Sequence, residues 1–108
     1  TLSLHDALPI CVKKPFICGS DCQDWVNEVS CEERVKMILD SAKNGQIFLL
    51  HDSQGVTETV QKTVQALKIA IPILKERGFD FVTVPEIFRL LNVNPFVKGK
   101  IWSNVLDL

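Results

Sequence analysis

The feature that most constrains the fold is a short apolar run that ends in a histidine, the sequence QIFLLH at Gln46–His51. Its apolar residues follow one another without alternation, which is typical of a strand buried on both faces, as in a parallel sheet. Parallel strands need long crossover connections, and helical patterns stand on both sides of this run. The sequence therefore predicts an α/β fold in which parallel strands and helices alternate along the chain.

The helix predicted before this strand has a clear start. Ser30, with a glutamate three residues later, makes a capping box, and apolar residues then recur at helical spacing. The pair Asn44-Gly45 is a stop signal, because glycine adopts the left-handed conformation found at helix C-termini. We expect this helix at about 31–43 and a short buried strand before it, within Pro15–Gly19.

The segment after the histidine predicts a polar loop at Asp52–Lys62 and a helix at about Thr63–Arg77. Pro72 lies inside this helix, where it removes one backbone donor and should bend the axis. Gly78 is expected to end the helix. Its buried face would consist of four apolar residues, Val64, Leu67, Ile71 and Leu74.

The last third of the chain predicts one more strand, a short helix and a tail. Phe79–Val84 has the composition of a strand. Pro85–Leu91 predicts a short helix, with the proline in its first turn. Asn92–Leu108 is a tail of mixed character, in which Phe96 and Trp102 would dock the chain.

Charge and composition exclude several classes of function. Twelve basic and thirteen acidic residues give a formal net charge of −1 and a pI near 6.0, which argues against a nucleic-acid footprint or a polybasic membrane anchor. The hydrophobic share of 46% and the charged share of 23% are typical of a globular domain. No apolar run approaches the ~18 residues that a membrane-spanning helix needs. We therefore expect neither a nucleic-acid partner nor a membrane span.

The four cysteines all fall in the first third of the chain, at Cys11, Cys18, Cys22 and Cys31. Their spacing is not the paired C-x2-C pattern of a zinc module. An even number leaves one or two disulfides open, but free and mostly buried thiols are the ordinary state of cysteine among apolar neighbours. We expect free thiols.

The first ten residues, Thr1–Ile10, do not resemble the rest of a domain. They lack an initiating Met and the charge-then-apolar layout of a signal peptide. Their sequence, TLSLHDALPI, can be back-translated into one reading frame of a widely used short-read sequencing adapter. We therefore interpret this segment as a sequencing scar, which makes its His5-Asp6 pair irrelevant to function. The native stretch would then start near Cys11, inside a gene.

Two polar positions follow the first two predicted strands, at Asp21–Trp25 (DCQDW) and at His51-Asp52. In parallel α/β folds, ligands bind at the carboxyl ends of the strands. An Asp and a His at neighbouring strand ends can form a hydrogen bond, which fixes the imidazole tautomer and raises the His pKa above its reference of ~6.5. Such a His can act as a general acid.

Three structural alternatives compete with that interpretation. A single His at a strand end is more often a hydrogen-bonded structural residue, and an Asp-rich turn is more often a helix cap or an Asx-turn. A lone Trp is more often part of the core than of a binding site. The residues by themselves leave these alternatives open.

The same two motifs resemble the polysaccharide deacetylases (NodB-homology domain, carbohydrate esterase family 4). DCQDW at Asp21–Trp25 and NGQIFLLHD at Asn44–Asp52 are similar to the last two motifs of that family. The stretch TVQALKIAIPILKERGFDFVTVPEIF at Thr63–Phe88 is similar to its closing helix–strand–helix. The resemblance covers Pro15–Leu91 and assigns residues 11–91 to the C-terminal portion of such a domain.

The resemblance implies the C-terminal part of a distorted (β/α)7-type barrel, with about three strand–helix units. It implies a hydrolase that removes acetyl groups from an N-acetylglucosamine polymer or acetylxylan, with a divalent metal, usually zinc, held by an Asp and two His. By motif position, His51 would protonate the leaving group and Asp24 would orient it. Trp25 and Leu49 would form the wall for the acetyl methyl group, and Asp21 would support the site from behind.

The chain also departs from the family pattern. Three motifs are absent: a TFDDG-type sequence, H-[ST]-x-x-H-P, and Arg-x-Pro-Tyr. The chain has no Tyr, and its two histidines are His5 and His51. We therefore expect the base and the metal ligands in a missing N-terminal half, no metal bound to this fragment, and no activity of the fragment alone. About three parallel strands would also leave exposed edges that favour aggregation.

Two other functions are compatible with the sequence. One is a small flavodoxin-like binding domain, and the other is a non-catalytic carbohydrate-binding relative that never had the metal motifs. The family commonly acts on extracellular polymers, which favours a secreted or surface-bound protein. Neither the polysaccharide nor the choice between amide and ester bonds follows from these residues.

Overall fold

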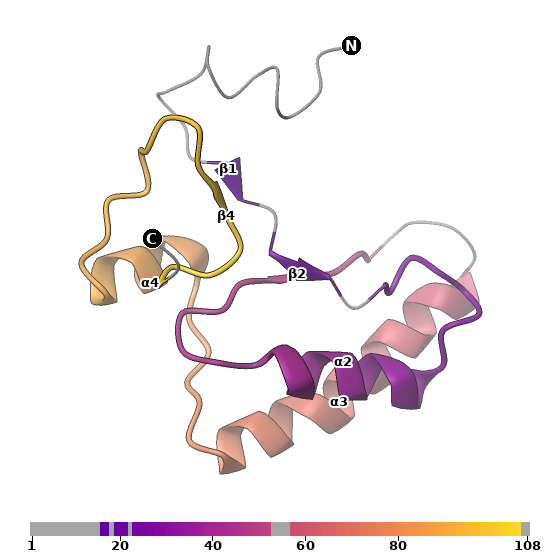
Figure 1. The fold of residues 1–108 in the computed structure, drawn as a ribbon. Coiled ribbons are helices and arrows are strands. Elements are labelled where there is room, and N and C mark those ends of the chain that lie inside the picture. The colour runs from indigo at the N-terminus through magenta and orange to yellow at the C-terminus, as the bar shows by residue number, and fades with distance from the viewer. Residues whose placement is uncertain (1–15, 18, 22, 53–56, 107–108) are drawn as a thin grey trace, which may run out of the picture.

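The computed structural model describes residues 16–17, 19–21, 23–52 and 57–106. The proposed scar at Thr1–Ile10 and the cysteines Cys11, Cys18 and Cys22 lie outside the described residues. The described elements follow one another along the chain (Figure 1) as β1 (Phe16–Ile17), β2 (Ser20–Asp21), α2 (Cys31–Ser41), β3 (Phe48–Leu49), α3 (Thr57–Glu76), α4 (Val84–Leu90) and β4 (Ile101–Trp102). The chain is α/β, as the sequence predicts.

The strands are two residues long and form two parallel pairs. In one pair, β2 lies beside β3, with Asp21 opposite Leu49. In the other, β1 lies beside β4, with Ile17 opposite Trp102. The strands pair in parallel, as the sequence predicts, but the partners differ from the prediction. The predicted strand at Pro15–Gly19 contains β1, which pairs with β4, whereas β3 pairs with Ser20–Asp21, where a polar turn was expected. The described residues form no continuous sheet or closed barrel.

Gly19 lets the chain pass close to β3 between β1 and β2. Its φ is +79°, and a Cβ at this position would lie 2.9 Å from the backbone nitrogen of Leu49 and 3.0 Å from the carbonyl carbon of Phe48. Real Cβ atoms are not found so close to backbone, so only glycine allows this approach. The pairing of β2 with β3 depends on it.

The predicted capping box starts α2. The backbone N–H of Glu33 donates to Ser30 Oγ at 3.1 Å, and the backbone N–H of Ser30 donates to Glu33 Oε2 at 2.8 Å. The helix ends at Ser41, two residues before the predicted end, because Ala42 is extended (φ −69°, ψ 122°). Gly45 has a φ of +79° in the turn that follows, so it does not cap the helix directly.

The prediction for α3 is wrong at its start. The helix begins at Thr57, so 57–62 is helical where a loop was expected. Thr59 and Thr63 are buried there. The inner face of this first part is lined by hydrogen-bonded polar side chains rather than apolar ones. Because a helix prediction depends on apolar residues at helical spacing, it placed the start of the helix several residues after Thr57. At the other end, α3 continues through Pro72, and Gly78 follows with a φ of +94°.

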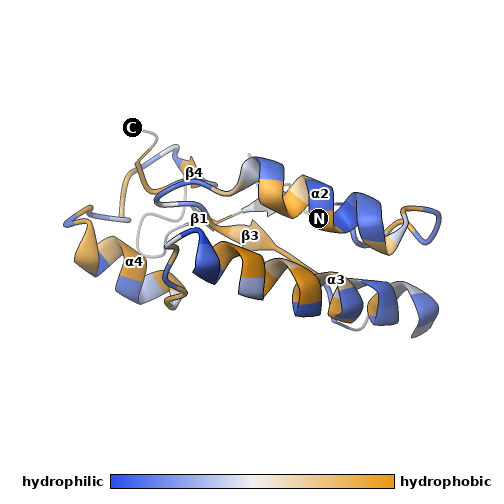
Figure 2. Cartoon of the chain, turned by 90° about the horizontal axis from the view of Figure 1, so that it is seen from below, coloured by the Kyte–Doolittle hydropathy of each residue, from blue (hydrophilic) through white to orange (hydrophobic). Residues whose placement is uncertain are grey.

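The buried face of α3 also differs from the prediction. It consists of Thr59, Thr63, Ala66, Ala70 and Leu74, of which only Leu74 belongs to the predicted set, and predicted Leu67 packs against the core half-buried. Val64, one of the predicted residues, is 44% exposed. The small alanines leave room for α2, which lies beside α3 (Figure 1). Figure 2 shows that the end of α3 that starts at Thr57 is mostly hydrophilic, whereas apolar residues gather along its middle.

The predicted strand at Phe79–Val84 is absent. Residues 79–83 form no strand hydrogen bonds with a neighbouring segment and lead directly into α4. A groove separates this segment from 42–48, so no neighbouring backbone offers the hydrogen bonds that a strand needs. The helix α4 itself begins as predicted, with Thr83 as its N-cap and Pro85 in the first turn.

Within the part of the chain that the structure describes, two small apolar cores hold the fold together. Ile38, Ala70 and Leu74 form the first, between α2 and α3. The second consists of Ile47, Phe88, Trp102 and Val105. The rings of Phe88 and Trp102 meet edge to face with centroids 5.0 Å apart.

The tail docks as predicted through Trp102 but not through Phe96. Trp102 is 1% exposed, and its Nε1–H donates to the Pro95 carbonyl at 3.0 Å. Phe96 is 54% exposed. The strand β4 within this tail was not predicted, because its pairing with β1 joins segments far apart in the sequence.

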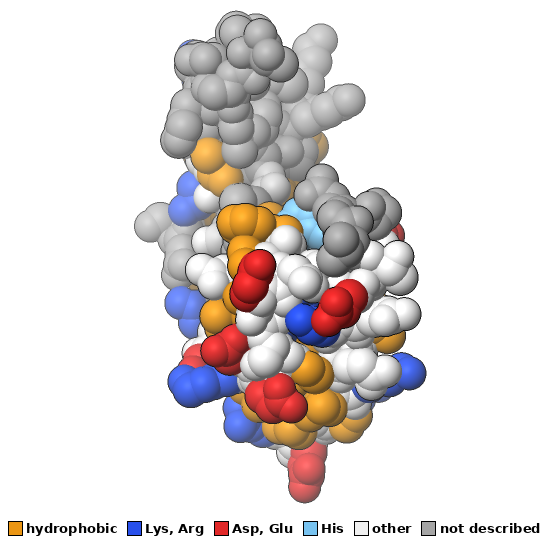
Figure 3. All heavy atoms as spheres, turned by 90° about the vertical axis from the view of Figure 1, so that its right-hand side faces the viewer, with side chains coloured by type: hydrophobic (Ala, Val, Ile, Leu, Met, Phe, Trp, Pro, Cys, Tyr) orange, Lys and Arg blue, Asp and Glu red, His pale blue; other side chains and the backbone are white. Residues whose placement is uncertain are grey.

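Cys31 is a free thiol, half-buried at the first residue of α2, as expected. No helix in the described part of the chain is long and apolar enough to cross a membrane. Figure 3 shows acidic and basic side chains interspersed over one face of the molecule, in line with the balanced charge of the sequence.

Candidate functional site

The parallel pairing of β2 with β3 brings Asp24 and His51 together. Asp24 follows β2 in the chain and His51 follows β3, so both lie past the carboxyl ends of the paired strands. Asp24 Oδ1 lies 2.8 Å from His51 Nδ1, and Asp24 Oδ2 accepts the His51 backbone N–H at 2.6 Å. One carboxylate thus holds the histidine by its ring and by its main chain.

Burial distinguishes the two partners. The Asp24 side chain is completely buried, whereas the His51 side chain is 27% exposed. The carboxylate therefore lies behind the ring and the ring faces outward. When Nδ1 carries the proton shared with the carboxylate, Nε2 is the nitrogen on the far side of the ring from Asp24. That arrangement can hold a proton at Nε2 for transfer to a group in front of the ring.

A second layer of buried polar groups lies behind Asp24. Thr63 Oγ1 is 3.4 Å from Asp24 Oδ2 and accepts a hydrogen bond from Arg34 Nη1 at 2.9 Å. The Arg34 guanidinium is fully buried. Its other hydrogen bonds, of 2.7 to 3.0 Å, go to three backbone carbonyls, those of Thr59, Val26 and Val29. This cation is therefore well solvated by the protein.

Sequence reasoning missed Arg34 and Thr63, although each leaves a signal. Arg34 lies one helical turn before Ile38 and so belongs to the apolar face of α2. Thr63 lies on the same face of α3 as Ala66 and Ala70. A charged or polar residue on an apolar stripe indicates a buried partner.

The turn that carries Asp24 is also fixed to α3. Thr59 Oγ1 donates to Asn27 Oδ1 at 2.9 Å, and Lys62 Nζ donates to the Asn27 carbonyl at 2.6 Å. Lys62 also lies 3.4 Å from Glu58. These contacts join the turn at 23–29 to the first two turns of α3, so the position of Asp24 does not depend on β2 alone.

The residues predicted to line an acetyl pocket lie at the surface. Trp25, next to Asp24 in the chain, is 54% exposed, and Leu49, next to Asp21 on the paired strand, is 36% exposed. The backbone of Asp21 is in β2, and its side chain is outside what the structure describes. The roles given to these three residues stay predictions.

The described residues do not fit the metal that the family resemblance implies. Within the described ranges, no group of three or more His, Cys, Asp or Glu side chains could hold a metal ion. Both carboxylate oxygens of Asp24 accept hydrogen bonds from His51. No catalytic step through a metal is therefore derived from this chain.

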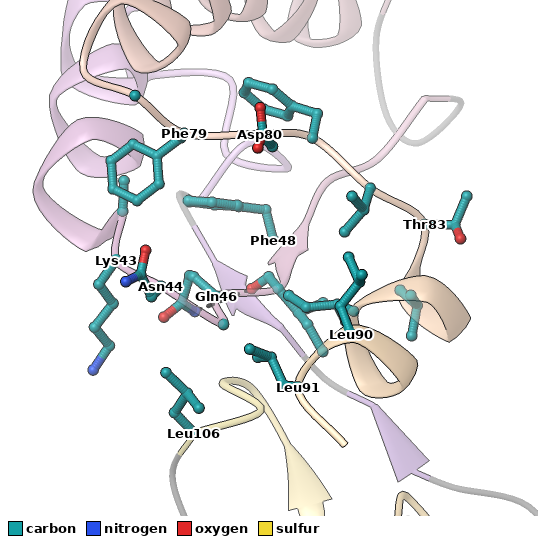
Figure 4. Close-up of a pocket in the computed structure, with 18 residues that line it drawn as sticks. Lys43, Asn44, Gln46, Phe48, Phe79, Asp80, Thr83, Leu90, Leu91 and Leu106 are labelled. Atoms are coloured by element: carbon teal, nitrogen blue, oxygen red, sulfur yellow. Dashed lines mark hydrogen bonds between the residues drawn. The ribbon is translucent and has the colours of Figure 1, made fainter. Parts of the chain in front are cut away.

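A groove of about 510 Å3 lies away from the histidine (Figure 4). It runs between 42–48 and the segment 78–84, and its lining includes neither Asp24 nor His51. In Figure 4, Phe48 and Phe79 lie on one side and Leu90 and Leu91 on another, so its walls are largely apolar. Geometry and chemistry favour the Asp24–His51 pair over this groove as the functional site.

Comparisons with curated proteins find relatives of one kind. No protein-family model matches the chain. It is 45% identical over 104 residues to a bifunctional xylanase/deacetylase of Pseudobutyrivibrio xylanivorans, a match that covers 96% of this chain and 17% of the relative. It is 44% identical over 69 residues to a peptidoglycan-N-acetylglucosamine deacetylase of Bacillus cereus, covering 64% of this chain and 30% of the relative. The first match includes part of Thr1–Ile10, and the origin of those ten residues stays a prediction.

Solved structures give a similar result. A family 4 acetyl xylan esterase from Clostridium thermocellum, in complex with a cobalt ion, superposes with a TM-score of 0.76 at 35% identity, over 85% of this chain and 44% of that one. The Xyl-CE4 domain of a multidomain xylanase from the hindgut metagenome of Trinervitermes trinervoides gives 0.72 at 48% identity, over 84% and 42%. The chain thus spans less than half the length of each of these proteins.

Proposed function

We propose that this chain is the C-terminal part of a polysaccharide deacetylase of carbohydrate esterase family 4, a hydrolase that removes acetyl groups from a polysaccharide. The relatives are named for deacetylation of peptidoglycan N-acetylglucosamine and chitooligosaccharide, and for acetyl xylan esterase activity. The proposed substrate class is accordingly an N-acetylglucosamine polymer or acetylxylan.

One observation supports the proposal most directly: a fully buried carboxylate holds a partly exposed imidazole at 2.8 Å. In deacetylation, the tetrahedral intermediate collapses by breaking its bond to the leaving nitrogen or oxygen. The oxyanion re-forms the carbonyl, the electron pair goes to the leaving atom, and that atom needs a proton. Protonated His51 would supply it from Nε2, and Asp24 would stabilise the imidazolium before transfer.

The exposed residues beside the pair suit a carbohydrate surface. Trp25 offers a flat apolar ring next to Asp24, and Leu49 precedes His51 on the neighbouring strand. Aromatic rings pack well against apolar faces, and a small apolar wall fits an acetyl methyl group. We assign both residues to substrate binding, with Asp21 in a supporting position.

The other half of the reaction, the attack of water on the acetyl carbonyl, has no residues in this chain that we can assign. In the proposed enzyme, the base and a divalent metal such as zinc would be supplied by a segment outside this chain, which would also complete the (β/α) barrel. The 108-residue chain alone would then be inactive.

The test is acetate release by the restored protein. The reading frame upstream of the Cys11 codon would be recovered, and the intact product assayed on acetylxylan and on chitooligosaccharides with and without zinc. We expect His51→Ala to lower the rate by roughly 10²- to 10⁴-fold, the usual contribution of a general acid. The exposed Lys36→Ala is the matched control and should keep full activity.

The outcomes separate the competing interpretations. Acetate release that persists in His51→Ala would keep the activity but remove the proton-donor role. An intact gene without upstream metal-ligand motifs, and a product that binds oligosaccharide without releasing acetate, would identify a non-catalytic carbohydrate-binding relative instead.

A further inference from the structure

We propose that Arg34 and Thr63 are positioning residues that hold the Asp24 carboxylate behind His51 and limit how strongly it retains the histidine proton. The use of this arrangement in catalysis rests on the proposed function. The geometry itself does not. Neither residue contacts the solvent-facing side of the site, so both would act only through Asp24.

The hydrogen bonds connect α2 to the site through α3, with each donor pointing toward Asp24. Arg34 Nη1 donates to Thr63 Oγ1 at 2.9 Å, so the threonine hydroxyl accepts on that side. Its own hydrogen then has two acceptors in range, Asp24 Oδ2 at 3.4 Å and the Thr59 carbonyl at 3.3 Å. The Thr59 carbonyl already accepts from Arg34 at 2.7 Å, and the carboxylate carries the negative charge. Donation to Asp24 is therefore favoured.

All three residues linked by these hydrogen bonds are buried: Asp24 is 1% exposed, Arg34 0% and Thr63 5%. In such surroundings, a hydroxyl dipole and a nearby cation act on a carboxylate more strongly than they would in water. Lys62 and Glu58, from α3, are paired with each other nearer the surface, and Asp52 is exposed. The Arg34 charge is thus the cation that the described residues bury behind Asp24.

The Thr63 hydroxyl lies between the Arg34 guanidinium and the Asp24 carboxylate. A guanidinium that bound the carboxylate directly through two parallel hydrogen bonds would compete with His51 for acceptor sites on both oxygens. Here Oδ1 is left to the ring of His51, and Oδ2 accepts from its backbone. The cation still stabilises the carboxylate through Thr63, without displacing the histidine.

This arrangement has a definite consequence for proton binding. Each donor to Asp24 stabilises its negative charge and so weakens its hold on the imidazolium proton. A general acid must release its proton at the operating pH, so a carboxylate that is too basic would slow the step. Removing the Thr63 hydroxyl should therefore raise the pKa of His51, whereas removing the Asp24 charge should lower it.

The experiment is an NMR titration of His51 in the full 108-residue chain, at low concentration with ¹³C-labelled histidine. His5→Gln in every sample leaves one histidine signal. We expect Thr63→Val to raise the pKa of His51 by roughly 0.3 to 0.5, and Thr63→Ser to restore the original value. Asp24→Asn should lower the pKa by about one unit. Thr57→Val, at the exposed start of α3, is the matched control and should leave it unchanged.

The proposal is overturned if Thr63→Val titrates like Thr57→Val, or if it lowers the pKa of His51. It is also overturned if Asp24→Asn has no effect, because there is then no carboxylate influence to modulate. Amide spectra show whether each variant is folded. Should Thr63→Val unfold, Thr63→Ala gives a second test, because it removes the same hydroxyl and should also raise the pKa of His51. The titration needs neither metal nor substrate, so its failure is distinct from failure of the acetate-release assay.

Discussion

Side chains are buried differently in two regions of the molecule, the polar network around Asp24 and the apolar groove between 42–48 and 78–84. At the Asp24 end, charged and polar side chains are buried, and no buried side-chain nitrogen or oxygen in the described residues lacks a hydrogen-bond partner. At the other end, apolar side chains such as Phe81, Val82 and Leu90 stay 44–57% exposed beside a groove. The polar end is complete within this chain, whereas the apolar end is not.

The difference follows from the range of the two interactions. A hydrogen bond needs one correctly placed partner, so Arg34 is satisfied by three carbonyls and one hydroxyl, which come from the turn at 23–29 and from α3. Apolar burial needs surface area, which only a further packed layer can supply. A buried hydrogen-bond network can thus be locally complete in a chain whose apolar side chains remain partly exposed. The following predictions test this contrast, from the largest expected effect to the smallest.

Arg34→Met should be the most damaging single substitution at the polar end. It removes the donors to three carbonyls and to Thr63, and leaves Asp24 buried without its cation. Breaking a buried charge network in this way costs about 3–5 kcal/mol of unfolding free energy, measurable by urea denaturation. Arg89→Met, at an exposed Glu86 pair, is the control. Equal effects from the two variants would contradict the importance of the buried network.

Gly19→Ala should separate the strands that bring the site together. The added Cβ meets the Leu49 nitrogen at 2.9 Å, and the φ of +79° is itself unfavourable, so we expect a loss of about 2–3 kcal/mol. Gly99→Ala has a similar φ of +81° but no atom within 4 Å, and it isolates the conformational part of the cost. If both variants lose the same stability, the close approach of Gly19 to β3 is not important.

The groove should make the isolated chain self-associate. Sedimentation of the 108-residue chain is expected to show a larger average mass as the concentration rises, because exposed apolar surface favours association. Phe81→Lys, within the groove lining, should reduce that dependence, and Phe96→Lys, similarly exposed but outside this groove, should reduce it less. A chain that stays monomeric at every concentration would show that the groove does not promote self-association.

The exposed ion pair on α2 should contribute least. Asp40 accepts a hydrogen bond from Lys36 and raises the pKa of this lysine above 10.5. The small stabilisation of the folded state that results is present below pH 10.5 and is lost as the pH rises through the higher pKa of the folded chain. Both side chains are well exposed, and such pairs are screened by water and salt. Lys36→Met should leave the urea midpoint unchanged at pH 7. A loss approaching that of Arg34→Met would remove the contrast between buried and exposed charge.

Several features of the fold could be predicted because their causes are local. The capping box at Ser30 uses residues three apart, and Pro85 fits the first turn of α4 wherever that helix packs. The run before His51 predicts a parallel strand from hydrophobicity alone, but the expected burial on both faces is wrong, because Leu49 in β3 is 36% exposed. The strand expected at Phe79–Val84 has an equally suitable composition, yet it does not form, because a strand also needs a neighbour.

The sequence by itself determined that Asp24 and His51 each follow an extended segment, and it placed the helices between them. Only the tertiary structure decided that Arg34, Thr59 and Thr63 lie behind this pair, since these contacts join residues 25 to 39 positions apart. Periodicity can assign a side chain to the inner face of a helix, but not to its partner on another element. A buried polar residue is stable only beside that partner, so its role is fixed by packing.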